Sequence, residues 1–266
     1  MDGTFYSSPS YFCQLYSIHA KVDGYMCPLV YGLLPNKQER TYTRFFNLIK
    51  DFATENNIPL SPDTVMMDFE TAAWRAVSGI FDVSVRGCFF HFTWSKVQSL
   101  GLVCEFRDNY EVKKLVMSAL PLVPLASVED VWFEALDDCD DDSAQVLRFK
   151  DYITEQWVEG DRQAWNHFNN DGPWTTNHVE GWQHKINNQL KHCHPNIYTL
   201  LDIIKKEQAA NQAKIFQHAN GGKQRQRKRV YRQLEERLAR FKDQLSMGDM
   251  DTMSYVDAVS HLVKLH

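Results

Sequence analysis

Two runs of β-branched and aromatic residues near the amino terminus constrain the fold most. They cover Tyr11–Ala20 and Tyr25–Leu34, and Val22-Asp23-Gly24 between them supplies the residues of a hairpin turn. Strand-forming runs joined by such a turn pair in an antiparallel manner. We therefore expect the fold to begin as an antiparallel β-meander.

Beyond the meander, helical and strand patterns alternate. Apolar residues between Tyr42 and Ala53 recur at helical spacing, and the short apolar run Thr64–Met67, which ends at Asp68, suits a buried strand. The pattern then predicts a helix at Thr71–Ile80, a strand at Ser84–Phe90 and a helix over about residues 92–100. The alternation indicates an α/β fold.

From about residue 110 the strand signal disappears. Apolar residues keep helical spacing up to Trp165, with breaks at Pro121 and Pro124, which predicts an inserted helical subdomain. After Pro173 the chain stays helical, and Glu180 falls on the polar face of a helix. An acidic stretch within the insertion, residues 137–142, is best interpreted as a solvated loop between helices.

Composition limits the functional classes. The net charge of −5 argues against nucleic-acid binding over the whole surface, so any DNA contact must come from local basic patches. The six cysteines are scattered and do not resemble a secreted disulfide framework. No apolar run approaches the roughly 18–20 residues of a membrane span, so we expect no membrane association.

Three acidic residues occupy positions where the predicted elements can bring them together. Asp2 lies on the first strand of the meander, Asp68 ends the next buried strand and Glu180 lies on a late helix. This is the layout of an RNase H-like fold. Clustered carboxylates repel one another unless a divalent cation is present, and Mg²⁺ (or Mn²⁺) accepts carboxylate ligands. The three acids are therefore our candidate metal ligands and catalytic residues.

Several segments, taken in order, closely resemble the transposases of Mutator-like elements (MULEs). They are Met1-Asp2-Gly3-Thr4-Phe5, Gln14-Leu15-Tyr16-Ser17-Ile18-His19, residues 28–37, Met67-Asp68-Phe69-Glu70-Thr71-Ala72-Ala73, Gly87-Cys88-Phe89-Phe90-His91-Phe92, Trp165-Asn166, residues 175–182 and His194-Pro195-Asn196-Ile197-Tyr198. The resemblance covers about residues 1–215.

The resemblance implies a catalytic role for Asp2, Asp68 and Glu180, which match the acidic triad of the family, while Cys88 and His91 match its Cys-x-x-His signature. It implies metal-dependent DNA cleavage and strand transfer in cut-and-paste transposition, with transposon ends and target DNA as partners. We also expect a homo-oligomer when active, a nuclear location and no small-molecule cofactor.

The pattern and the resemblance together predict an α/β fold with an RNase H-like mixed sheet flanked by helices. The predicted segments are the first part of the core at residues 1–104, an all-helical insertion at 105–170, the last part of the core at 171–218 and a basic helical extension at 219–266.

The roles of several other residues stay open at this point. Glu70 is either an auxiliary acid or, as we favour, a charge at a helix amino terminus. Cys88 and His91 lack a second ligand pair of conventional spacing, so we do not expect zinc, and His91 is either a helix-start residue or a phosphate or base contact. Trp182, beside Glu180, is a candidate for stacking on DNA.

A basic tract near the carboxyl end is a candidate phosphate contact or nuclear import signal, with a solvated helix as the equal alternative. Its members are Lys223, Arg225, Arg227, Lys228, Arg229 and Arg232.

Asp2 directly follows Met1, whereas the family places strand residues and DNA-binding modules further upstream. We therefore expect a truncated first strand, which puts catalysis in doubt. Two alternatives to an active core stay open: a domesticated DNA-associated regulator without catalysis, and an inactive fragment.

Overall fold

The protein is described here from a computed structural model. It describes residues 1–266 except 23–24, 117–119, 171, 173, 223–228 and 263–266, and the side chains at 89, 90, 92, 93, 110 and 114 are also left aside. The described chain divides into two compact units. The first unit is Met1–Val85 with Thr175–Arg225, and the second is Arg86–Trp174 with Gln226–His266.

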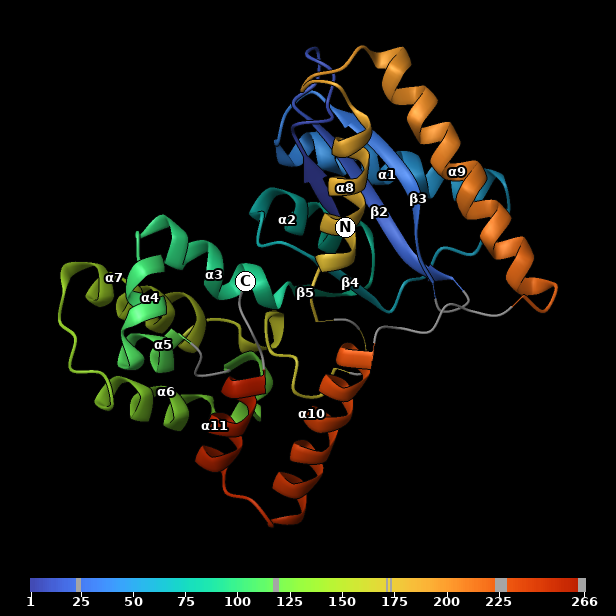
Figure 1. Ribbon diagram of the computed structural model, residues 1–266. Helices are drawn as coiled ribbons and strands as arrows, with labels where there is room; N and C mark the ends of the chain where they lie inside the picture. The colour runs from blue at the N-terminus through green and yellow to red at the C-terminus, as the bar shows by residue number, and fades with distance from the viewer. Residues whose placement is uncertain (23–24, 117–119, 171, 173, 223–228, 263–266) are drawn as a thin grey trace. The chain divides into compact units, whose positions relative to one another are not determined.

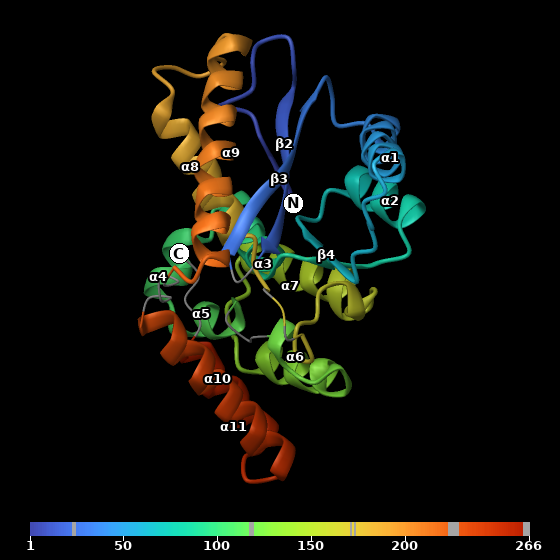
Figure 2. The ribbon, with the colours of Figure 1, turned by 90° about the vertical axis from the view of Figure 1, so that its right-hand side faces the viewer.

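The first unit is a mixed α/β structure whose sheet has helices on both faces (Figures 1 and 2). Its elements are β1 (Asp2–Thr4), β2 (Gln14–Val22), β3 (Tyr25–Leu34), α1 (Glu39–Glu55), β4 (Thr64–Met67), α2 (Thr71–Ile80), the start of β5 (Ser84–Gly87), α8 (Asn177–Gln189) and α9 (Ile197–Ala219). The predicted strand at Thr64–Met67 and helix at Thr71–Ile80 are confirmed at the predicted residues.

The meander is antiparallel, as predicted, with strand order β1-β2-β3, while β4 and β5 form a separate two-stranded pair. A register shift at Ile18/His19 interrupts the β2–β3 ladder, and Pro28 lies opposite His19 there. Proline lacks an N–H group, and a sheet tolerates it on an edge strand such as β3. The predicted hairpin turn at Asp23-Gly24 lies outside the described residues.

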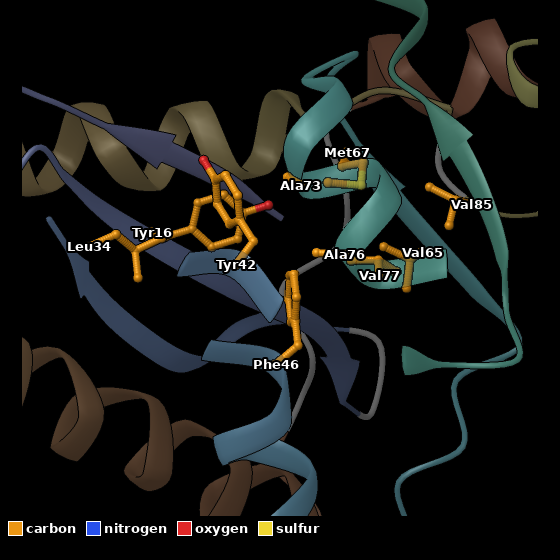
Figure 3. Packing of buried hydrophobic residues seen from close by; sticks show 10 residues of the cluster. All are labelled: Tyr16, Leu34, Tyr42, Phe46, Val65, Met67, Ala73, Ala76, Val77 and Val85. Carbon is orange, nitrogen blue, oxygen red and sulfur yellow. The ribbon is translucent and has the colours of Figure 1, made fainter. Parts of the chain in front are cut away.

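Alternation along β2 divides the first unit into two cores. Tyr16 faces one core together with α1, α2, β4 and β5, and Figure 3 shows Tyr42 and Phe46 of α1 beside it. Leu15, the preceding residue, faces the opposite core, where it joins Trp182 and Ile186 of α8 and Leu200 of α9. Successive strand residues point to opposite faces, so one strand serves both cores.

Two predicted boundaries in this region are wrong. The strand predicted to start at Tyr11 begins at Gln14, because the Phe12 N–H closes a turn on the Pro9 carbonyl (2.8 Å). The strand predicted to run to Phe90 ends at Gly87, and a helix begins at Phe89. A short apolar run such as Cys88-Phe89-Phe90 does not by itself distinguish a strand from a helix.

Apart from the end of β5, the regular secondary structure of the second unit is helical in its described residues. Its elements are α3 (Phe89–Ser99), α4 (Val103–Asp108), α5 (Tyr110–Val116), α6 (Val128–Asp137), α7 (Ala144–Ile153), a π-helical turn (Thr154–Val158), short 3₁₀ turns (Leu120–Leu122, Leu125–Ser127 and Arg162–Ala164), α10 (Arg229–Met247) and α11 (Thr252–Leu262). Helical structure over residues 105–170 was predicted. This unit, however, starts at Arg86 and includes the carboxyl-terminal helices.

A buried hydrogen-bond network in the second unit includes Asn166 of the Trp165-Asn166 motif and the next residue, His167. The Asn166 amide donates to the Val123 carbonyl (2.9 Å), and the Asn166 carbonyl accepts from Arg86 Nη1 (2.8 Å). His167 Nε2 lies 2.8 Å from the Gly87 carbonyl, and its Nδ1 lies 3.1 Å from Asn170 Nδ2. A carbonyl only accepts, so Nε2 donates and Nδ1 accepts from the amide. This hydrogen-bond network therefore accommodates the neutral form of the His167 imidazole.

Among the described helices, none combines the length and the apolar character that a membrane crossing needs.

We expect Phe46→Ala to destabilise the protein strongly, because Phe46 is fully buried between the sheet and α2. Truncating a buried Phe costs about 3–5 kcal/mol. Phe52→Ala, on the same helix but 60% exposed, should change the free energy of unfolding by no more than about 0.5 kcal/mol. Urea unfolding measures both. Equal losses would contradict the assigned core.

We also expect stability to fall in mild acid because of His167. Burial, with Arg86 and Lys242 nearby, lowers its pKa from 6.5 to about 4. Below pH 6.5 His167 is therefore protonated in the unfolded chain but stays neutral in the folded chain. The free energy of unfolding falls as the pH falls towards 4. The contribution is at most about 3 kcal/mol. Unfolding measured between pH 7 and pH 4 should show a shallower pH dependence for His167→Gln than for the native protein; identical slopes would contradict this.

Candidate active site

Asp2 lies in β1, opposite Ser17 of β2. Cross-strand partners share a face of the sheet, so Asp2 points to the side covered by α8. Its Oδ1 accepts from the Gly3 N–H (2.7 Å), and its Oδ2 accepts from Gln183 Nε2 of α8 (3.2 Å). These bonds orient the carboxylate towards that helix.

Gly3 explains the Asp-Gly pairing in the first motif. It lies opposite Tyr16, and a Cβ atom at Gly3 would overlap the Gln14 side-chain oxygen and lie 3.3 Å from the Tyr16 ring. A larger residue at this position would require the Gln14 side chain to move.

Asp68 directly follows β4, as predicted, and is half-buried. The Met1 amino group donates to the Met66 carbonyl (2.6 Å), which links the start of β1 to β4. Burial raises the pKa of the Tyr16 hydroxyl well above its ordinary value, and the charges of Asp68 and Asp2 raise it further.

Glu180 lies in the first turn of α8, as predicted, and is half-buried. Val179, Trp182 and Ile186 form the buried face of the helix. Gln183 follows Glu180 by three residues, a spacing that places two side chains on neighbouring positions of one helix surface. Because Gln183 contacts Asp2, α8 is anchored to β1 within one turn of Glu180.

All three predicted acids therefore belong to the first unit. Carboxylate oxygens are the ligands that Mg²⁺ accepts in proteins, so the donor chemistry fits the ion. Among the described residues, no group of three or more His, Cys, Asp and Glu side chains could hold a metal ion as the side chains are placed.

Two histidines beside the acids were missed as site residues, although both fall within the quoted motifs. His19 lies 6.1 Å from His178 and 5.1 Å from Trp182 between ring centroids. Burial, with the Met1 amino group, lowers the pKa of His19 to about 3 and that of His178 to about 4. Both rings are therefore neutral at pH 7. The Thr175-Thr176-Asn177-His178 stretch preceding Glu180 was the available signal.

Glu70 has a structural role. It is the residue immediately before α2, as the favoured interpretation predicted, and its carboxylate accepts from Tyr42 Oη (2.6 Å) and Lys37 Nζ (2.7 Å). Tyr42 Oη in turn accepts from Gln14 Nε2 (2.6 Å). Burial and the hydrogen bond to Glu70 raise the pKa of Tyr42 far above its ordinary value. The chain of bonds ties β2, α1 and α2 together next to Asp68.

Cys88 and His91 lie in the second unit. Cys88 is fully buried and immediately precedes α3, and His91 is half-buried in the first turn of that helix. Their functional role stays a prediction.

The prediction that Trp182 stacks on DNA is corrected. Its side chain is only 8% exposed and packs between His19 and Tyr31 in the core beneath α8 and α9. Both neighbours are aromatic rings, which leave no open face for a base. Trp182 is a core residue.

Part of the basic tract lies outside the described residues, namely Lys223, Arg225, Arg227 and Lys228. Arg229 and Arg232 are exposed in the first turn of α10. Their contact with phosphate stays a prediction.

Comparison with known proteins gives one family match. Residues 1–95, a segment that contains Asp2 and Asp68, match the family model of the MULE transposase domain, so this part of the chain is similar to that domain. No curated protein and no solved structure matched the chain.

We expect Tyr42→Phe to lower the free energy of unfolding by about 1–3 kcal/mol, because it leaves buried polar partners unsatisfied. Glu70→Gln should also destabilise, and the double variant should lose less than the sum of the single losses because the residues share one network. Chemical unfolding measures this coupling. Tyr198→Phe, at an exposed position, is the control and should be neutral. Additive losses would contradict the network.

Proposed function

We propose that this chain is the catalytic core of a DNA transposase that cleaves and transfers DNA strands with Mg²⁺ or Mn²⁺. The observation that carries the proposal is the common location of Asp2, Asp68 and Glu180 in the first unit. Asp2 and Asp68 also lie within residues 1–95, the segment that matches the MULE transposase domain. We further propose that the unit is RNase H-like, with a β-meander bearing the first acid, a strand ending at the second and a helix bearing the third.

In this proposal Asp2, Asp68 and Glu180 would hold the divalent cations. When bound, such ions activate a water or 3′-hydroxyl and stabilise the leaving oxygen of the phosphodiester. Gln183 and the Gly3 N–H orient the Asp2 carboxylate, while the Tyr42–Glu70 network fixes the start of α2 beside Asp68. Tyr16 remains a neutral phenol and therefore adds no negative charge to the three acids.

The neutral histidines complete the proposed site. With pKa values of about 3 and 4, His19 and His178 carry no positive charge at pH 7 and do not compete with a cation for the carboxylates. They can still donate or accept hydrogen bonds. We also propose that the active protein is nuclear and homo-oligomeric, with transposon ends and target DNA as its partners.

We expect Asp68→Asn and Glu180→Gln each to reduce DNA cleavage more than about a hundredfold, because loss of even a second-shell partner of a metal ligand costs about 10–100-fold. Each substitution removes a negative charge and nearly preserves shape. The assay follows nicking and strand transfer on plasmid DNA that carries the ends of the element, in Mg²⁺, in Mn²⁺ and in EDTA.

Asp51→Asn is the matched control, since Asp51 is an exposed acid of α1 in the same unit, and it should cleave like the native chain. Thermal unfolding shows whether each variant is folded. If the folded native chain binds these ends without cleaving them, or if both acid variants cleave normally, a DNA-associated regulator replaces the enzyme as the better account.

A further inference from the structure

Exposed aromatic residues lie on two neighbouring segments of the first unit, the loop that follows β1 and the start of α9. These residues are Phe5, Tyr6 and Tyr11 from the β1–β2 loop, and Tyr198 from the first turn of α9. They are 48%, 42%, 92% and 78% exposed, respectively. We call these four side chains the aromatic platform. Figures 1 and 2 show the β1–β2 loop beside the connection between α8 and α9.

The loop beneath the platform is held by its own hydrogen bonds. The Ser8 N–H donates to the Phe5 carbonyl (3.1 Å), and the Cys13 N–H donates to the Leu34 carbonyl (2.8 Å). Ser7, Ser8 and Pro9 are buried, although the aromatic residues on either side are exposed. The rings therefore project from a fixed backbone, so that little ordering entropy is lost when they bind a partner.

His194 fastens the α8–α9 connection to this loop. Its N–H donates to the Tyr6 carbonyl (2.9 Å), and its Nδ1 lies 3.0 Å from the Ser8 carbonyl, to which it donates. His194 has a φ of 52°, in the left-handed region that residues other than glycine rarely adopt. A conformation of this kind persists when the surroundings hold it. The two segments thus form one rigid surface, and Tyr198 belongs to it.

The sequence around the platform suits an anionic partner. Residues 3–14 and 190–199 contain no Asp or Glu, and the second segment contains Lys191. Lys37 Nζ lies 4.8 Å from the Phe5 ring centroid and is paired with the Glu70 carboxylate (2.7 Å).

We propose that the aromatic platform binds unpaired nucleotides of single-stranded DNA by stacking on their bases. Aromatic rings next to cations are the features by which proteins bind single strands without sequence preference. Phe5 follows Asp2 by three residues in the chain. The inference rests on the proposed function: the platform would guide the strand entering or leaving the acidic site.

The test is the binding of fluorescein-labelled oligonucleotides by the full 266-residue chain, followed by fluorescence anisotropy. A single strand and the duplex of the same sequence are compared. We expect Tyr11→Ala and Tyr198→Ala each to weaken single-strand binding by about 5–100-fold, the value of one stacked base, and to leave duplex binding unchanged. Tyr11→Phe keeps the ring and should bind like the native chain. Phe52→Ala, which removes an equally exposed ring elsewhere in the unit, should have no effect.

Abasic sites in the oligonucleotide provide a second measurement. They remove the base but keep the phosphates, so Tyr11→Ala should cause no further loss on an abasic strand. Lys191→Ala should instead reduce the salt dependence of binding to both the intact and the abasic oligonucleotide, because it removes a phosphate contact. Circular dichroism confirms that each variant is folded.

Three outcomes would overturn the proposal that the aromatic platform binds single-stranded DNA. The chain binds neither DNA, the tyrosine variants lose the same affinity for single strand and duplex, or both tyrosine variants keep the native affinity. Failure of the proposed function is separate. If the chain cleaves DNA in an acid-dependent manner but the tyrosine variants bind normally, only the platform is wrong. If the tyrosine variants lose single-strand binding while Asp68→Asn cleaves normally, the platform stands and the catalytic assignment falls.

Discussion

The two-sided burial of β2 is the constraint on which the first unit depends. Leu15 and Tyr16 are adjacent and both fully buried, one beneath α8 and α9 and the other beneath α1 and α2. A strand buried on both faces has no freedom to shift by one residue, because a shift would exchange the two faces. The register of β1 on β2 is thereby set, and with it the direction in which Asp2 points.

The electrostatics of the acidic site follow from that register. Asp2 and Asp68 both act on the buried Tyr16 hydroxyl, and α8 brings Glu180 within one turn of the residue that contacts Asp2. Carboxylate oxygens are the ligands that Mg²⁺ accepts in proteins, so the residue types of the three acids fit the proposed metal role.

The sequence allowed much of the first unit to be predicted, and the physical reasons are local. The meander, β4, α2 and the elements that carry the three acids all came from hydrophobic periodicity and turn residues. Periodicity could not separate Phe52 from the buried stripe of α1, because Phe52 differs from its neighbours only in what the tertiary fold places opposite it. For the same reason the sequence does not predict the burial of Trp182: it lies two residues after Glu180, while His19 and Tyr31 reach it from other elements.

Residues quoted for the family resemblance serve two kinds of role, and the sequence alone does not distinguish them. Asn166 satisfies backbone carbonyls inside the second unit, and Glu70 links Lys37 and Tyr42, so both have structural partners. Replacing a polar group of this type lowers the free energy of unfolding, because its hydrogen-bond partners are left unsatisfied. Asp2 likewise has partners, the Gly3 N–H and Gln183 of α8, and it is half-buried in a strand that faces the helix of Glu180. Having partners therefore does not separate a catalytic acid from a structural one. The proposed catalytic role of the three acids depends instead on their chemistry, because carboxylates are the ligands that a divalent cation accepts.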